Sequence, residues 1–554
     1  MRGERKKEQG EDKVRPGSKQ GEHKSKTNHS LPDRAHMSTN PAQTDFTQPA
    51  KVHSSIIPAT ILKVAPWLLL LTVAIFYLSW GITHSGPVRT WDEADFALAL
   101  HRFDLLAMQP HFPGYPYFVL GGILMHRWLD DPAQALAAWN LLLTATALVP
   151  LYLLSRRYLT PMTSAALAAF LITMPYLWLL ASQPMSEASG IAVLWWFLWS
   201  LAYALEHRST KRLLLSAALF GVLMGIRLSF VPFGAGLVYL WYAHYIRDYT
   251  TKRRKFYPRL LFILSTALAF QLIWVIGLAA SEGGLAGFLQ LSVAFVQGHF
   301  SEWGGGAASS SLPMGERVLQ YGINYFWTGL AAQSWIQAGA WAVIGLTSAY
   351  SFLSRPNNSS TKPDPILKLI LLVVTAYGLW AFFAQNIEKP RHLSPLVAVS
   401  VWLVLAYALQ TASKTQLHRG LLVALTAGIA MNLYTGTGWL TEQRMKPSAV
   451  AQLGNYMESV NEPLVLYTWE ETRVLAYNGA DFPHQRIETF ELFKAEAEAQ
   501  QSTKRVFVTD HVLNGFHAQN AELDGRFVKV AAFRAHPIFD PVYADIVLYE
   551  WLSP

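Results

Sequence analysis

The sequence predicts an all-α polytopic membrane protein with a small α/β domain at its C-terminal end. Of its 554 residues, 52% are apolar and only 15% are charged, whereas soluble globular proteins carry about a quarter charged residues. Mean hydropathy is +0.20 although the N-terminal region is polar. The 20 Trp and 23 Tyr residues are of the types that gather at membrane interfaces. These observations exclude a soluble multidomain enzyme, a disordered chain and a fibrous chain.

The chain divides into three parts. Residues 1–64 are rich in Lys, Gln, Ser and Glu and predict a disordered basic cytoplasmic tail, because such a segment cannot bury enough apolar surface to fold. Residues 65–440 predict a membrane domain with a first outer loop at 83–132. A span needs roughly 20 apolar residues, and we expect about eleven spans. They lie near 65–82, 133–154, 162–181, 188–206, 213–228, 231–246, 260–280, 325–352, 366–384, 394–411 and 419–436.

The distribution of basic residues predicts the orientation. Lys and Arg gather in the N-terminal tail and in alternate loops, such as 156–157 and 247–259, as cytoplasmic loops do. This bias holds only if the apolar segment Tyr115 to Trp128 does not cross the membrane, so we expect a juxtamembrane or re-entrant helix there. We therefore expect a plasma-membrane protein whose N-terminus is cytoplasmic and whose residues 441–554 lie outside the cytoplasm.

The C-terminal part reads as a soluble α/β domain. Its β-branched and aromatic runs predict four strands, and the residues between them include a helical pattern. The expected strands are 462–469, 504–509, 527–533 and 544–551, and the expected helix is 491–501.

Several classes of function are excluded by what the sequence lacks. The chain has no cysteine, so it forms no disulfide, thiolate nucleophile or zinc–thiolate site. Its net charge of +8 is explained by the loop bias and predicts no nucleic-acid partner. The expected spans carry no ionisable residue near a midpoint, which argues against an ion-coupled transporter. No glycine-rich phosphate loop is present.

The first outer loop contains the most informative acidic residues, Asp92, Glu93 and Asp95. If Asp92 begins a helix as an N-cap, Asp92 and Asp95 share a face while Glu93 points elsewhere. A carboxylate beside a membrane surface is suited to deprotonate an acceptor hydroxyl. The alternative is that Asp92 only caps a surface helix.

A tight turn follows in the same loop, and charged residues recur at other outer positions. In His111-Phe-Pro-Gly-Tyr-Pro116 the prolines and glycine are explained by the turn itself, whereas His111 and Tyr115 are candidates for substrate contact. Further candidates are Glu187, Arg227, Arg391 and His392. An arginine at membrane depth is costly unless it faces protein, water or a phosphate, and snorkelling is the alternative for both arginines.

The loop 281–321 contains a flexible, glycine-rich segment, Gln297 to Gly306, of the kind that can order over a substrate. His299 is a candidate substrate contact within it. His299 and Glu302 are three residues apart, but a zinc site needs a third ligand, and none is identifiable. We therefore expect no metal site, and metal dependence stays open.

These features resemble the GT-C superfamily of integral-membrane glycosyltransferases, in particular glycosyltransferase family 39 and the protein O-mannosyltransferase-like enzymes. The features are the acidic pair after the first span, the Pro-Gly-Tyr-Pro segment and the basic outer mouth, and the resemblance covers about residues 65–436. It implies transfer of a sugar, mannose or a similar hexose, from a polyprenyl-phosphate donor to a protein, lipid or glycan acceptor outside the cytoplasm. No cofactor is implied, since the lipid-linked sugar is a co-substrate.

The resemblance also implies roles for individual residues. Asp92 falls at the catalytic aspartate, Glu93 completes the acidic pair, and Arg227 and Arg391 fall near the positions that bind the donor phosphate. An inverting displacement with one carboxylate base suits a donor that already has a good leaving group. The alternatives are an O-antigen-type ligase or polymerase, a lipid-linked glycan transporter, and a receptor that senses ligands through its C-terminal domain.

Overall fold

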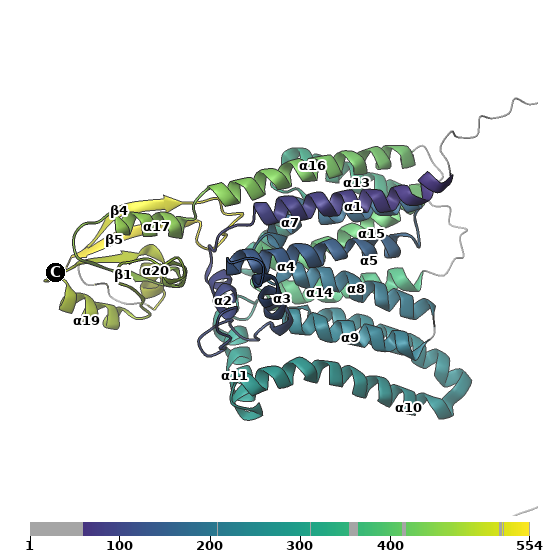
Figure 1. The fold of residues 1–554 in the computed structure, drawn as a ribbon, viewed down its shortest axis with the longest axis horizontal. Coiled ribbons are helices and arrows are strands. Elements are labelled where there is room, and N and C mark those ends of the chain that lie inside the picture. The colour runs from purple at the N-terminus through teal and green to yellow at the C-terminus, as the bar shows by residue number, and fades with distance from the viewer. Residues whose placement is uncertain are drawn as a thin grey trace, which may run out of the picture. The chain divides into compact units, whose positions relative to one another are not determined.

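The computed structural model describes residues 59–207, 209–310, 312–353, 364–412, 417–519, 523 and 526–552. The expected tail, 1–64, lies outside the described residues up to position 58, and the first helix begins at Ala59. The described chain is mainly α-helical, with a five-stranded sheet near its C-terminal end (Figure 1). The structure confirms the predicted fold class, an all-α polytopic membrane protein with a small C-terminal α/β domain.

The helical part begins with α1 and ends with α16. Its α-helices are α1 (Ala59–Thr83), α2 (Trp91–Ala99), α3 (Pro116–His126), α4 (Pro132–Thr146), α5 (Leu148–Ser155), α6 (Pro161–Ile172), α7 (Pro175–Ala181), α8 (Glu187–Glu206), α9 (Thr210–Ile226), α10 (Ala235–Ser281), α11 (Leu285–Gly298), α12 (Met314–Gly322), α13 (Trp335–Leu353), α14 (Pro365–Ala384), α15 (Ser394–Ala412) and α16 (Leu417–Met445). Shorter turns are the 3-10 helices η1 (Leu228–Gly234) and η4 (Pro390–Leu393) and the π-helical η2 (His299–Trp303) and η3 (Ile323–Leu330).

Several helices of the bundle begin at a capping residue followed by proline. Asp131 accepts hydrogen bonds from the backbone at the start of α4, Thr160 does so for α6, and Asp364 for α14. In each case proline occupies the first turn, where its missing N–H costs nothing. The sequence therefore sets these helix starts locally, before any packing.

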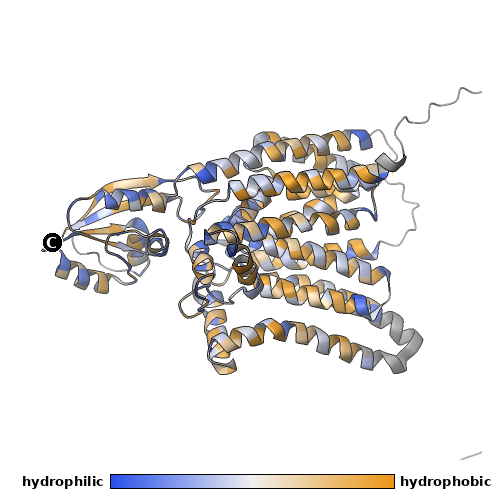
Figure 2. Cartoon of the chain, in the orientation of Figure 1, coloured by the Kyte–Doolittle hydropathy of each residue, from blue (hydrophilic) through white to orange (hydrophobic). Residues whose placement is uncertain are grey.

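Among the described residues, seven helices are long and apolar enough to cross a membrane. They are Lys63–Thr83, Pro132–Ser155, Glu187–Glu206, Leu260–Ser281, Pro365–Ala384, Pro390–Ala412 and Leu417–Glu458. The pair α6 and α7, bent by 62°, raises the number to eight if it is one span. Apolar residues line these long helices (Figure 2).

The number of such helices is smaller than the eleven expected, because one expected span is a short helix and two others are broken. The stretch 213–228 is the 17-residue helix α9. The stretch 231–246 is divided between η1 and the start of α10, and 325–352 between η3 and α13. Hydropathy is high across such breaks, so it does not reveal them. The segment 115–128 contains only α3, whose 11 residues reach about 16 Å, too short to span the bilayer.

The C-terminal sheet has the strand order β2-β1-β3-β5-β4. The elements of this part are α17 (Ala449–Glu458), β1 (Leu464–Thr468), α18 (Glu471–Tyr477), β2 (His484–Arg486), α19 (Phe490–Gln500), β3 (Arg505–Thr509), α20 (Asp510–Ala518), β4 (Arg526–Arg534) and β5 (Asp545–Leu552). β1 pairs in parallel with β2 and β3, whereas β5 is antiparallel to β3 and β4. The four predicted strands are β1, β3, β4 and β5; the three-residue β2 was not predicted.

The sheet and the helical bundle share apolar cores. Ala94 and Ala97 of α2 are buried in the same cluster as Leu466 and Phe507 of the central strands. In the opposite direction, Phe539, from the connection between β4 and β5, belongs to the core of the helical bundle. Because each part packs residues into the core of the other, α2 and its acidic residues are held between the two parts.

Candidate active site

The helix α2 begins with a capping box. The Thr90 hydroxyl accepts a hydrogen bond from the Glu93 N–H, and the Glu93 carboxylate accepts from the N–H groups of Thr90 (3.1 Å) and Arg89 (2.6 Å). The expectation that Asp92 is the N-cap is therefore wrong, because Thr90 supplies the capping oxygen two residues earlier. The side chain of Asp92 is left for other contacts.

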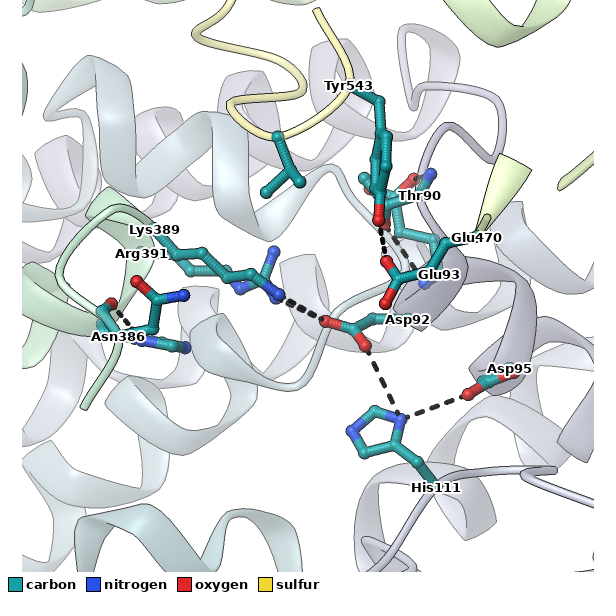
Figure 3. Close-up of polar contacts among 12 residues, drawn as sticks. Thr90, Asp92, Glu93, Asp95, His111, Asn386, Lys389, Arg391, Glu470 and Tyr543 are labelled. Atoms are coloured by element: carbon teal, nitrogen blue, oxygen red, sulfur yellow. Dashed lines mark hydrogen bonds and ion pairs between the residues drawn. The ribbon is translucent and has the colours of Figure 1, made fainter. Parts of the chain in front are cut away.

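Asp92 is the centre of a group of ion pairs (Figure 3). Its Oδ2 accepts a hydrogen bond from the Arg391 guanidinium and lies 3.8 Å from Lys389 Nζ. Partial burial opposes ionisation, but the charges of Lys389, Arg391 and His111 together hold the pKa of Asp92 well below its usual range. The side chain is 26% exposed, so an approaching molecule can reach it.

Glu187 lies on the other side of Arg391. As the first residue of α8 it is buried, with its Oε1 3.0 Å from Arg391 Nε and 2.9 Å from the Arg227 guanidinium. Arg227, at the end of α9, also donates a hydrogen bond of 2.7 Å to the Ser186 hydroxyl. Arg391 thus bridges Asp92 and Glu187, and each buried charge has a partner, as its desolvation requires.

His111 links the two aspartates of α2 to the turn that follows. Its Nδ1 lies 3.4 Å from Asp95 Oδ2 and 3.9 Å from Asp92 Oδ1, which confirms that the two acids share a face. Its Nε2 lies 3.0 Å from the Tyr115 hydroxyl. Tyr115 has φ +46° and the preceding Gly114 has φ +89°. A tyrosine held in the left-handed region is strained, which is a feature of functional sites.

The C-terminal domain contributes a cation to this group. Arg473 of α18 lies 2.9 Å from Asp95 Oδ1 and donates hydrogen bonds to the carbonyls of Ala107 (2.9 Å) and Met108 (3.1 Å). Burial raises the pKa of Asp95, and the charges of His111 and Arg473 oppose that rise. Arg473 thereby ties the C-terminal domain to α2 and to the loop after it.

A second contribution from the C-terminal domain is Glu470. Its carboxylate accepts a hydrogen bond from the Tyr543 hydroxyl (Figure 3). Burial raises the pKa of Glu470, an effect that the hydrogen bond and Lys389 counteract and that Asp92 reinforces. Glu470 is therefore a further carboxyl group in the electrostatic surroundings of Asp92 and Lys389.

Behind α2 lies a buried group formed by Arg89, Glu93 and Asp540. Arg89 donates hydrogen bonds to the carbonyls of Gln443 and Lys446. Burial raises the pKa of Glu93 to about 7, and the nearby charge of Asp540 adds to that rise; burial also raises the pKa of Asp540 to about 6, against the hydrogen bonds from the backbone of Tyr543 and Val542 and the charge of Arg89. This group is buried and supports the acidic loop from within the protein.

The structure brings most of the predicted site residues together. The assembled residues are Asp92, Asp95, His111, Tyr115, Glu187, Arg227 and Arg391. Glu93 turns inward as the cap of α2. His392 is directed to its own loop, where its Nδ1 lies 2.8 Å from the Asn386 carbonyl. His299 lies in η2, with its ring stacked on Phe295 at 5.9 Å.

Sequence reasoning missed Lys389, Glu470 and Arg473. Lys389 lies two residues before Arg391 in the same short loop, and that proximity was a usable signal. Glu470 and Arg473 lie in a different domain, and no pattern in the sequence relates them to Asp92. Only the packing of α18 on α2 shows the connection.

The cations of the arrangement are suited to bind an anion. Among the residues that the structure describes, no three His, Asp or Glu side chains are grouped as metal ligands; the side chain of Glu302, the conceivable partner of His299, is outside them. Three cations, Lys389, Arg391 and Arg227, instead converge on two carboxylates. Such a cluster can exchange a carboxylate for a phosphate, which guanidinium groups bind well.

Comparisons with known proteins give one family and several similar structures. Residues 111–274 match the family model described as dolichyl-phosphate-mannose-protein mannosyltransferase, which confirms the resemblance predicted from the sequence. No curated protein sequence matches the chain.

The similar solved structures are distant in sequence. ArnT from Cupriavidus metallidurans bound to undecaprenyl phosphate has a TM-score of 0.49 and 12% identity, over 89% of this chain and 98% of that chain. The apo state of the same protein gives 0.49 and 13%, over 88% and 98%. The apo oligosaccharyltransferase of Archaeoglobus fulgidus gives 0.47 and 13%, over 81% and 70%.

Proposed function

From the mannosyltransferase-family domain at residues 111–274, we propose that this membrane protein transfers a sugar, mannose or a similar hexose, from a polyprenyl-phosphate donor to an acceptor hydroxyl. The observation that carries the proposal is the pairing of Asp92 with Arg391 and Lys389. A base and the cations for a phosphate leaving group lie within one ion-pair cluster. The bias of basic residues between loops supports a reaction outside the cytoplasm.

The proposed reaction is an inverting displacement. Asp92 takes the proton of the acceptor hydroxyl while the acceptor oxygen attacks the anomeric carbon. The bond between that carbon and the phosphate oxygen breaks, and the phosphate leaves with the electron pair. Arg391, Arg227 and Lys389 stabilise the negative charge that develops on it.

The ion pairs of Asp92 explain how a weak base becomes competent. In the structure, Lys389 and Arg391 hold the pKa of Asp92 low, against the effect of its partial burial, so its carboxylate has little affinity for a proton. A donor phosphate that engages the same two cations weakens their hold on Asp92, and the pKa of Asp92 then rises. Donor binding therefore prepares the base before the acceptor arrives.

The test uses purified protein in lipid nanodiscs with a radiolabelled polyprenyl-phosphate hexose and membrane extract as the source of acceptor. We expect loss of the lipid-linked sugar with the wild type and a rate at least a hundredfold lower with Asp92→Asn, the lower end of what a general base contributes. Asp130→Asn is the matched control, because Asp130 is an exposed acid of the same loop.

A measurement of the binding of polyprenyl phosphate, which carries no sugar, separates donor binding from sugar transfer. Arg391→Gln should weaken this binding, whereas Asp92→Asn should leave it intact or strengthen it, because Asp92 competes with the phosphate for the cations. An Asp92→Asn protein that folds normally and turns over donor at the wild-type rate would refute the assignment of the base.

A further inference from the structure

The helix α11 presents an aliphatic face that no part of the described chain covers. Leu285, Leu289, Val293 and Val296, here called the aliphatic face, are between 48% and 65% exposed. At 100° per residue these four positions lie within an arc of about 80°. Such a stripe on a soluble surface would be a liability, so a partner of apolar chemistry must cover it.

The rest of α11 divides into two further faces. Phe288, Leu291 and Phe295 turn toward the protein and are buried or half-buried, whereas Gln290 and Gln297 are exposed. No charged residue occurs between Leu285 and Gly298. A helix with one protein-facing, one aliphatic and one polar uncharged face matches a helix that lies in the plane of a membrane interface.

The position of α11 indicates that the partner is the bilayer. The preceding helix α10 contains the candidate span Leu260–Ser281, along which Leu268, Ile273 and Ile276 are strongly exposed. α11 begins four residues after that span ends and runs across its direction (Figure 1). The aliphatic face thus continues the lipid-facing surface of α10 around a corner.

The inner face of this corner holds the turn of the candidate active site. The Phe112 ring lies 4.8 Å from that of Phe295 and 5.8 Å from that of Phe288. Gly114 is packed so closely on Leu278 of α10 that an added Cβ would lie 3.0 Å from its Cδ2. The residues on either side of Phe112 and Gly114 include His111, which contacts both aspartates, and Tyr115, whose hydroxyl contacts His111.

We propose that α11 lies on the membrane surface with its aliphatic face in the bilayer and that, through Phe112, it braces the His111–Tyr115 turn. The lipid surface is then part of what orders the site. This inference does not depend on the proposed sugar transfer, because it rests on burial and packing alone.

The absence of cysteine from the chain makes the first test direct. Single cysteines placed at Leu289, Val293, Gln290 and Gln297 are spin-labelled in nanodiscs that hold one copy each. We expect the labels at 289 and 293 to be accessible to oxygen and shielded from a water-soluble nickel complex, and the labels at 290 and 297 to show the reverse. Water exposure at all four positions would overturn the proposal. Shielding of 289 and 293 from both reagents would also overturn it, because protein would then cover the face.

The second test measures the bracing of the turn. Leu289→Asn combined with Val293→Asn should make the amides of residues 111–115 exchange hydrogen severalfold faster in nanodiscs, because a loosened α11 no longer holds Phe112. Gln290→Asn combined with Gln297→Asn is the matched control and should leave exchange unchanged. Equal exchange in the two variants would refute the bracing. Neither test requires a sugar donor, so failure of the proposed function would leave both results interpretable.

Discussion

The ion pair between Arg473 and Asp95 gives the most demanding test of how the C-terminal domain holds the site. Arg473→Met keeps the length of the side chain but removes its charge, which leaves Asp95, a fully buried carboxyl, without its partner in the C-terminal domain. The protein then either keeps an uncompensated buried charge, at about 3–5 kcal/mol, or protonates Asp95.

Protonation sets an upper limit on the cost, and that limit depends on pH. An aspartate with an ordinary pKa of 3.8 takes up a proton at pH 7 at a cost of about 4 kcal/mol, and at pH 5 at a cost of about 2 kcal/mol. The pKa of Asp95 is already raised in the folded wild type. The contribution of this shift to the free energy of unfolding is therefore fully present below pH 3.8 and is lost as pH rises through the folded-state pKa. Arg473→Met raises that pKa further and extends the loss to higher pH.

The assay is unfolding of the nanodisc-embedded protein at about pH 5 and about pH 7, where the two limits differ by about 2–3 kcal/mol. We expect Arg473→Met to be more destabilising at the higher pH, with a pH-independent part of about 1 kcal/mol for each hydrogen bond lost to Ala107 and Met108. Adding Asp95→Asn should remove the pH dependence. A cost that is equal at both pH values, or that the second change does not relieve, would refute the reasoning.

Three further outcomes are expected. Glu93→Gln keeps the capping acceptor but removes a carboxyl whose pKa burial raises from 4.5 to about 7. Between these two pH values, the free energy of unfolding of the variant should rise by up to about 3 kcal/mol relative to that of the wild type, and a constant difference would contradict this. Gly121→Ala places a Cβ 2.0 Å from the Trp139 ring, and overpacking of about 1–3 kcal/mol should lower the thermal midpoint. Tyr543→Phe deprives Glu470 of its hydrogen bond, so its cost, about 1–2 kcal/mol, should be larger at neutral than at acidic pH in the same unfolding assay; an equal cost would mean that Glu470 is not ionised.

Much of the fold follows from local sequence patterns. Capping residues before proline, as at Asp131 and Asp364, mark helix starts, and alternating β-branched and aromatic residues mark four of the five strands. The breaks at η1 and η3 could not be predicted, because apolar composition continues through them. The strand β2 has only three residues, which are too few to show the alternating pattern by which a strand is recognised.

The part of the candidate site that could be predicted consists of ionisable residues that lie close together in the sequence. Asp92, Asp95 and His111 lie in one loop, and the spacing of the two aspartates indicated a shared helix face. Arg391 and Glu187 come from distant helices; the cost of an arginine at membrane depth singled out Arg391, and its outer position singled out Glu187. The inward turn of Glu93 depended on which residue, Thr90 or Asp92, caps α2. The contribution of Arg473 arises from domain packing, which no local pattern encodes.

The insertion of Phe539 into the helical core has a consequence for biosynthesis. A ribosome makes α1 to α16 before it reaches the connection between β4 and β5, so the bundle enters the membrane while Asp540 and Tyr543 do not yet exist. During that interval Asp95 lacks Arg473, and Glu470 is not yet beside Tyr543. The group of charges around Asp92 and Asp95 is therefore complete only after the C-terminal domain has been translated, folded and docked, which is later than the membrane insertion of the bundle.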